Sequence, residues 1–81
     1  MFSFIETQLF TRLVKQYLSD DQYAELQKAL MENPELGPVI AGTGGVRKMR
    51  WAAPSRGTRG GYRLIYYVRR PKGIIWMLAL P

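Results

Sequence analysis

Apolar residues recur with two different periods along this chain, and the periods predict the order of its secondary structure. Residues 1–5 alternate bulky and small side chains, as a short strand does. Between residues 7 and 18 the apolar residues return every three or four positions. They are Leu9, Phe10, Leu13, Val14 and Tyr17. This stripe predicts an amphipathic helix whose apolar side packs on a core.

A second helix is predicted to begin immediately after Ser19. The segment Ser19-Asp20-Asp21-Gln22 has the form of a capping box, in which the serine and glutamine side chains bind each other's backbone amides. The apolar stripe then continues at Tyr23, Leu26, Ala29 and Leu30. Asn33-Pro34 is expected to end the helix, because a residue before proline avoids helical backbone angles.

Three strands are predicted in the second half, at residues 46–52, 62–69 and 74–80, after a proline- and glycine-rich loop at 35–45. Residues 54–61 are expected to form a hairpin loop and residues 70–73 a tight turn. Side chains of a strand point alternately to its two faces. One face therefore carries Met49, Trp51, Leu64, Tyr66 and Val68, and the other carries Lys48, Arg50, Arg63, Ile65, Tyr67 and Arg69.

Together these elements predict a single domain at residues 1–81 with an α+β fold, in which a short N-terminal strand and two helices pack on an antiparallel β-sheet. The last strand is apolar on both faces, with Ile75, Met77 and Ala79 on one and Ile74, Trp76, Leu78 and Leu80 on the other. Two helices can cover only one face. We therefore expect this strand to form an exposed edge that pairs with a second chain, either another copy or a different partner.

Charge separates the two halves of the chain. Residues 1–35 hold all six acidic residues and three basic ones, a net charge of −3, whereas residues 36–81 hold nine basic residues and a net charge of +9. Seven of those nine are arginine, which matches phosphate geometry better than lysine does. This segregation predicts a polyanionic partner, and the alternative is a basic surface that serves solubility alone.

Several classes of site are excluded by composition. The chain has no cysteine and no histidine, which removes disulfides, thiolate zinc sites and histidine-based acid–base catalysis. The glycine cluster at residues 42–45 is not a P-loop, because Lys48 is followed by Met49 in a strand-like run. No apolar run approaches the roughly 20 residues that cross a bilayer, and residues 1–20 do not resemble a signal peptide. We therefore expect a cytoplasmic protein with no membrane partner.

Two connected motifs resemble the HigB-like branch of the RelE superfamily of toxins. One is Leu-Gly-x-Val-Ile-x-Gly-Thr-Gly-Gly-x-Arg-Lys-x-Arg at residues 36–50, and the other is Arg-Gly-Gly-x-Arg-x-Ile-Tyr-Tyr at residues 59–67. The segment Tyr-Leu-Ser-Asp-Asp-Gln-Tyr at residues 17–23 is similar as well. The resemblance covers nearly the whole chain in order, without a large gap.

The resemblance implies the toxin of a type II toxin–antitoxin pair, an mRNA interferase that inhibits translation. Such toxins act on messenger RNA on the ribosome, bind a cognate antitoxin, and need neither metal nor cofactor. Their catalytic cations lie on the sheet, at the positions that Lys48, Arg50 and Arg63 occupy here. Relatives continue with a basic, aromatic tail that has no counterpart in residues 1–81, so the domain is expected to be C-terminally truncated. A catalytically inactive remnant that binds RNA or antitoxin is therefore the alternative.

Cleavage through a ribose 2′-hydroxyl requires a proton acceptor, charge stabilisation at the phosphate and an acid for the leaving oxygen. Arginine keeps its proton near neutral pH but binds phosphate bidentately, so Arg50 and Arg63 are the predicted phosphate clamps. Lys48 is the predicted proton acceptor. The other predicted RNA contacts are Arg47, Arg56, Arg59 and Tyr67. A solvated strand face is the alternative for the cations, base stacking and packing stay equally open for Tyr67, and packing is expected for Trp76.

Overall fold

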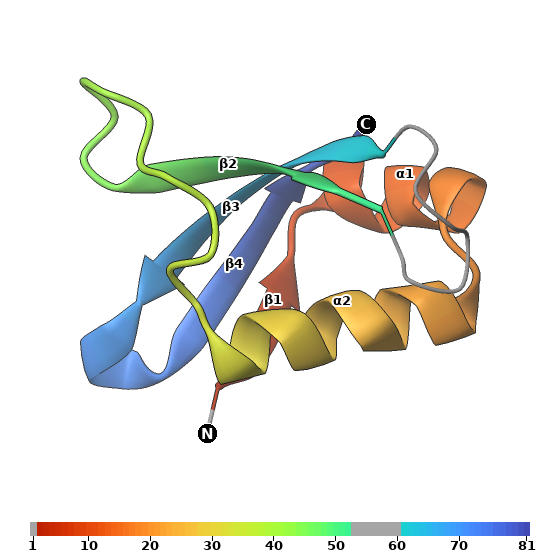
Figure 1. Ribbon diagram of the computed structural model, residues 1–81, viewed down its shortest axis with the longest axis horizontal. Helices are drawn as coiled ribbons and strands as arrows, with labels where there is room; N and C mark the ends of the chain where they lie inside the picture. The colour runs from red at the N-terminus through yellow and green to blue at the C-terminus, as the bar shows by residue number, and fades with distance from the viewer. Residues whose placement is uncertain (1, 53–60) are drawn as a thin grey trace.

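The computed structural model describes residues 2–52 and 61–81 and has an α+β fold in which two helices lie against one face of a four-stranded sheet (Figure 1). Its elements are β1 (Ser3–Glu6), α1 (Gln8–Tyr17), α2 (Asp20–Glu32), β2 (Val46–Trp51), β3 (Tyr62–Arg69), the 3-10 turn η2 (Arg70–Lys72) and β4 (Ile74–Ala79). The predicted order of elements is confirmed. Most of the predicted 54–61 hairpin loop lies outside the described residues.

Both helices begin at a capping residue, and the sequence pattern indicates the one before the second helix. The Thr7 hydroxyl accepts a hydrogen bond from the Phe10 amide at 3.0 Å and caps α1. At α2 the predicted capping box is present: Ser19 Oγ accepts from the Gln22 amide at 3.1 Å, and Gln22 Oε1 accepts from the Ser19 amide at 2.9 Å. Neither helix of the described chain is long and apolar enough to cross a membrane.

The strands follow the order β1-β4-β3-β2, and this order corrects the predicted sheet. The last three strands are antiparallel as expected. However, β1 pairs with β4 in parallel, with Ser3 beside Ile74 and Glu6 beside Met77, so the sheet is mixed. The prediction that the last strand forms an exposed edge is therefore wrong. Its backbone pairs on both sides, because the N-terminal strand occupies the edge that the sequence pattern left open.

A bulge where β3 pairs with β4 corrects the predicted faces of the last strand. The register shifts between Ile65 and Tyr66, so β4 carries one extra residue there. Beyond the bulge the alternation is reversed, and Leu80, which is 2% exposed, joins Ile75 and Met77 in the core. A strict period of two placed Leu80 on the opposite face, because a single extra residue exchanges the two sides of a strand.

The core lies between the sheet and the helices and contains no buried charged or polar residue among those described. It consists of Phe10, Val14, Leu18, Leu26, Leu30, Leu64, Tyr66, Ile75, Met77 and Leu80. Met49, Trp51 and Val68 pack against it, as the alternation in β2 and β3 predicts. The opposite face of the sheet has no helix over it (Figure 1). We call this surface the open face.

The loop before β2 covers part of the outer edge of that strand. The Lys48 amide donates to Pro38 O at 3.1 Å, the Ile40 amide donates to Val46 O at 2.7 Å, and Val39 forms an antiparallel bridge with Arg47. The approach is close, since a Cβ on Gly37 would lie 2.7 Å from the carbonyl oxygen of Lys48. Residues predicted only as a loop therefore support the strand that carries most of the predicted site.

Candidate nucleic-acid interface

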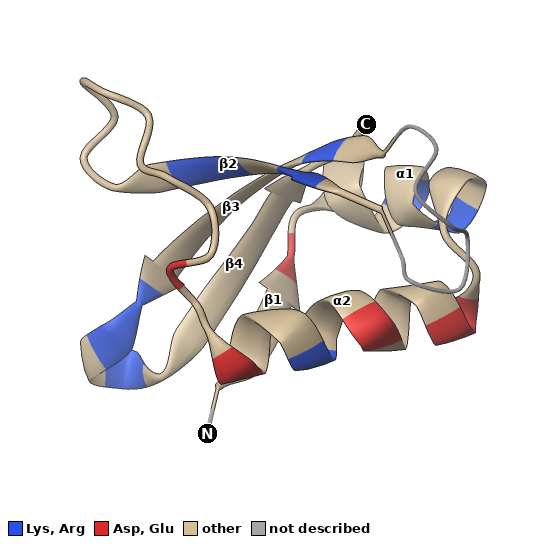
Figure 2. Ribbon diagram, viewed as in Figure 1, with Lys and Arg blue, Asp and Glu red and all other residues tan. Residues whose placement is uncertain are grey.

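The three predicted catalytic cations lie together on the open face, near the end of β2 and the start of β3. Lys48 and Arg50 alternate with the half-buried Met49 on β2, and Arg63 precedes the buried Leu64 on β3. All three cations are exposed. Figure 2 shows the basic positions along β2 and at the start of β3, whereas most acidic positions lie on α2, which covers the other face of the sheet.

Arg50 and Arg63 are direct cross-strand partners in the β2–β3 register. Like charges at directly opposite positions destabilise a sheet. Within residues 2–52 and 61–81 neither these two arginines nor Lys48 forms an ion pair with a carboxylate, and the one polar contact is Arg50 Nη1 to Gly61 O at 3.4 Å. An anion held between the two guanidinium groups would relieve this repulsion.

A cavity of about 360 Å³ lies beside these cations, lined by Pro38, Lys48, Met49, Arg50 and Arg63. It is large enough for a phosphate and part of a nucleotide, since ligand sites begin at about 300 Å³. The apolar side chains Pro38 and Met49 form its other walls. The cavity therefore combines three positive charges with apolar lining, which suits a phosphate attached to a sugar and a base.

The carboxylate nearest the N-terminus is engaged elsewhere. Glu6 accepts two hydrogen bonds of 2.6 Å, from the hydroxyl of Thr11 and from that of Tyr23, and so joins β1 to both helices. Burial, together with the negative charge of Glu6, raises the pKa of Tyr23 above its ordinary value. Both oxygens of the Glu6 carboxylate therefore bind residues of the helices, and Glu6 does not pair with the cations of the open face.

The open face also carries two aromatic residues side by side. Tyr67 on β3 and Trp76 on β4 are paired in register, and Ile5 of β1 lies on the far side of Trp76. Trp76 is 36% exposed, so its ring is partly packed and partly accessible. A sequence reading that treats each strand alone does not show this pair, because the register between strands brings the two rings together. Both rings offer faces on which bases could stack.

No known protein-family model matches this chain. The likeness to RelE-type toxins therefore depends on the motifs at residues 17–23, 36–50 and 59–67 together with the α+β arrangement.

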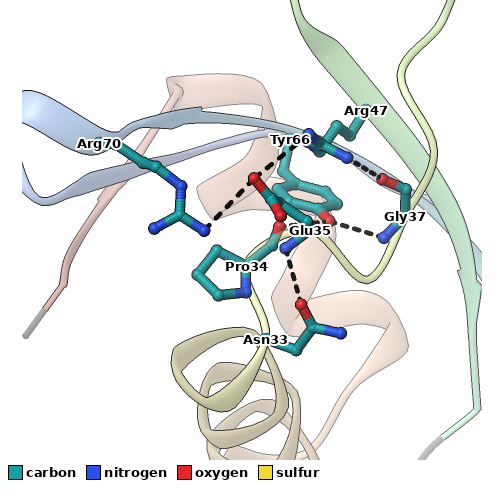
Figure 3. A network of polar contacts seen from close by, with 7 residues as sticks. All are labelled: Asn33, Pro34, Glu35, Gly37, Arg47, Tyr66 and Arg70. Carbon is teal, nitrogen blue, oxygen red and sulfur yellow. Dashed lines mark hydrogen bonds and ion pairs between the residues drawn. The ribbon is translucent and has the colours of Figure 1, made fainter.

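Among the remaining predicted RNA contacts, Arg47 does not join the three cations. Arg56 and Arg59 lie outside the described residues. Arg47 alternates with Lys48, so its side chain lies at the helix side of β2, where it is 20% exposed. Its Nη1 donates to Gly37 O at 2.7 Å, and its Nη2 lies 4.0 Å from Glu35 Oε2 (Figure 3). In this structure Arg47 therefore anchors the loop before β2.

Tyr66 is the other anchor of that loop. Its hydroxyl donates to Pro34 O at 2.8 Å and accepts from the Gly37 amide at 2.9 Å, and all three residues are buried (Figure 3). Burial raises the pKa of the Tyr66 hydroxyl above its ordinary value. The neutral hydroxyl thus satisfies both a donor and an acceptor of the backbone where the chain passes from α2 toward β2.

Replacing Tyr66 by phenylalanine is expected to lower the free energy of unfolding by about 2 kcal/mol, because two buried backbone groups lose their partner. For a domain of this size the melting temperature should fall by roughly 10 °C. Thermal unfolding followed by circular dichroism measures both. Tyr67→Phe is the matched control, since no hydrogen bond of its hydroxyl occurs among the described residues, and it should leave the melting temperature within about 2 °C. Equal effects of the two variants would contradict the anchoring role.

Proposed function

We propose that this protein is a RelE-type mRNA interferase, the toxin of a type II toxin–antitoxin pair, which binds messenger RNA on the ribosome with its open face and cleaves it. The observation that carries the proposal is the cross-strand pair of Arg50 and Arg63, with Lys48 on the same face and no described carboxylate to neutralise them. A fold does not retain an unpaired like-charge pair for stability. Such a pair is suited to a phosphate, which both arginines can bind bidentately.

The groups that bind the phosphate and accept the proton in the proposed reaction lie on the open face, whereas the acid for the leaving oxygen comes from water or from the ribosome. The 2′-oxygen attacks the adjacent phosphorus, the bond to the 5′-oxygen breaks, and a 2′,3′-cyclic phosphate forms. Arg50 and Arg63 stabilise the charge that accumulates on the phosphoryl oxygens. Lys48, in its neutral form, takes the proton of the 2′-hydroxyl, and water or a ribosomal group donates the proton that the leaving 5′-oxygen takes up.

A cleavage assay with ribosomes programmed with a messenger RNA tests this proposal. We expect cleavage that requires the ribosome, persists in EDTA and leaves 2′,3′-cyclic phosphate ends. Free messenger RNA is the control and should be cleaved far more slowly. The absence of any cleavage and any RNA binding in both reactions would overturn the proposal.

A second function is favoured by the same cavity. Among the described side chains that line it, Lys48 is the only one that can exchange a proton, whereas cleavage requires both an acceptor and a donor. A protein that binds RNA or an antitoxin on this face without cleaving would fit that composition. In the assay above this alternative predicts saturable RNA binding with no cleaved product.

RNA binding is expected to weaken steeply with salt, because each phosphate that a cation neutralises releases counterions. If Lys48, Arg50 and Arg63 each neutralise one phosphate of a single strand, each contributes roughly −0.7 to the slope of log affinity against log salt concentration. The slope should therefore be about −2 or steeper. Lys48→Ala should make the slope shallower by about 0.7. Fluorescence anisotropy with a labelled oligonucleotide measures the slope, and Lys28→Ala on α2 is the control that removes the same charge. A slope near zero would contradict binding by the basic face.

A further inference from the structure

A second cavity, of about 430 Å³, lies at the opposite end of β3 from Arg63. Arg47, Arg69, Arg70 and Glu35 line it, together with Tyr67 and the glycines of the loop before β2. Three guanidinium groups and one carboxylate leave this cavity with an excess of two positive charges. Arg69 follows Arg63 by six residues along an extended strand, so the cavity lies about 20 Å from the first cationic cluster.

Glu35 occupies the middle of the charged part of this cavity. Figure 3 shows its carboxylate between the guanidinium groups of Arg47 and Arg70, which approach the same oxygen, Oε2, at 4.0 and 3.4 Å. Charge-assisted hydrogen bonds are about 2.7–2.9 Å long, so both contacts are loose. The side chains of Glu35 and Arg70 are also about half exposed, at 54% and 55%, where ion pairs contribute little.

Two of the groups that line this cavity have contacts that do not involve Glu35. Arg47 is fixed by its 2.7 Å hydrogen bond to Gly37 O. Tyr67 lies against the loop at Gly45, where a Cβ would be 3.1 Å from its ring. The cavity thus has a hydrogen-bonded guanidinium, an aromatic ring close to the loop backbone and a loosely held carboxylate where an external anion could bind.

We propose that this cavity is a second RNA-binding site, which takes a phosphodiester between Arg47, Arg69 and Arg70 with the neighbouring base against Tyr67. Glu35 is its internal counter-ion and must be displaced when RNA binds. This inference rests on the proposed binding of RNA and extends it along β3. Tyr67 lines this cavity and also belongs to the open face, so one strand of RNA could pass from the first cationic cluster to the second site.

Removing the internal competitor should strengthen RNA binding. We expect Glu35→Gln to raise affinity for an octauridylate by about fivefold in anisotropy titrations, since the phosphate no longer displaces a carboxylate. Asp21→Asn is the matched control, because it removes the same charge from the first turn of α2, and it should change affinity less than twofold. Arg70→Ala should weaken binding about fivefold and should abolish the gain when combined with Glu35→Gln.

Chemical-shift titrations of the full chain with uridine 5′-monophosphate and with uridine locate the site. The monophosphate should shift the amides of Tyr67 and Arg70, more strongly in Glu35→Gln, and uridine should not. Equal affinities of Glu35→Gln and Asp21→Asn for octauridylate would overturn the second site while leaving RNA binding intact. If octauridylate fails to bind any variant, the proposed function falls. Shifts of the Tyr67 and Arg70 amides by the monophosphate would then show that the cavity binds a free nucleotide. If those shifts are also absent, the proposal that the cavity is a binding site is overturned as well.

Discussion

Replacing Arg63 by alanine is expected to lower the rate of ribosome-dependent mRNA cleavage by about 100- to 1000-fold, and Arg50→Ala should do the same. Each variant removes one of the two guanidinium groups that face each other across β2 and β3. The remaining arginine cannot hold the phosphate from both sides as its charge increases. Single-turnover cleavage of a programmed ribosome measures the loss.

Neither substitution should unfold the domain, because both side chains are exposed on the open face. The melting temperature should stay the same or rise slightly, since each change removes a like-charge repulsion. Lys28→Ala on α2 loses one charge away from the open face and should retain full activity. Near-normal cleavage by Arg50→Ala or Arg63→Ala at equal protein concentration would show that the active surface lies elsewhere.

Replacing Gly37 by alanine is expected to destabilise the protein by about 3 kcal/mol, at the upper end for overpacking of a well-packed site. The new Cβ would lie 2.7 Å from Lys48 O and 3.0 Å from Met49 Cβ, and neither the backbone nor the packed side chain can move away easily. The loop would have to leave β2, and the bonds of Gly37 to Tyr66 and Arg47 would break with it. The melting temperature should fall by at least about 12 °C.

Gly42→Ala separates this overlap from an effect of backbone conformation. Gly42 has a φ of 78°, but a Cβ there would meet nothing within 4 Å. The variant should cost about 1 kcal/mol through the left-handed conformation alone. If chemical denaturation shows Gly37→Ala to be no more harmful than Gly42→Ala, the close approach of loop and strand is not important for stability.

The local elements of this protein follow from its sequence because the signals that specify them are local. The capping box at Ser19, the break at Asn33-Pro34 and the alternation in residues 62–69 each act within a few residues. Alternation of side chains in β2 and in β3 also predicts that Lys48, Arg50 and Arg63 share one face of the sheet, opposite Leu64 and Tyr66. The composition also separates the charges of the two halves before any fold is known.

Tertiary structure alone decided what depends on contacts between distant segments. A four-residue strand carries no signal for its partner, so the sequence does not predict that β1 pairs with β4 in parallel. For the same reason it does not predict that β4 lies inside the sheet. One extra residue opposite Ile65 and Tyr66 reversed the side of Leu80, because a bulge depends on the register of two strands. Glu35, Arg47 and Arg70 come from a loop, a strand and a turn, and only the folded chain brings their charges around one cavity.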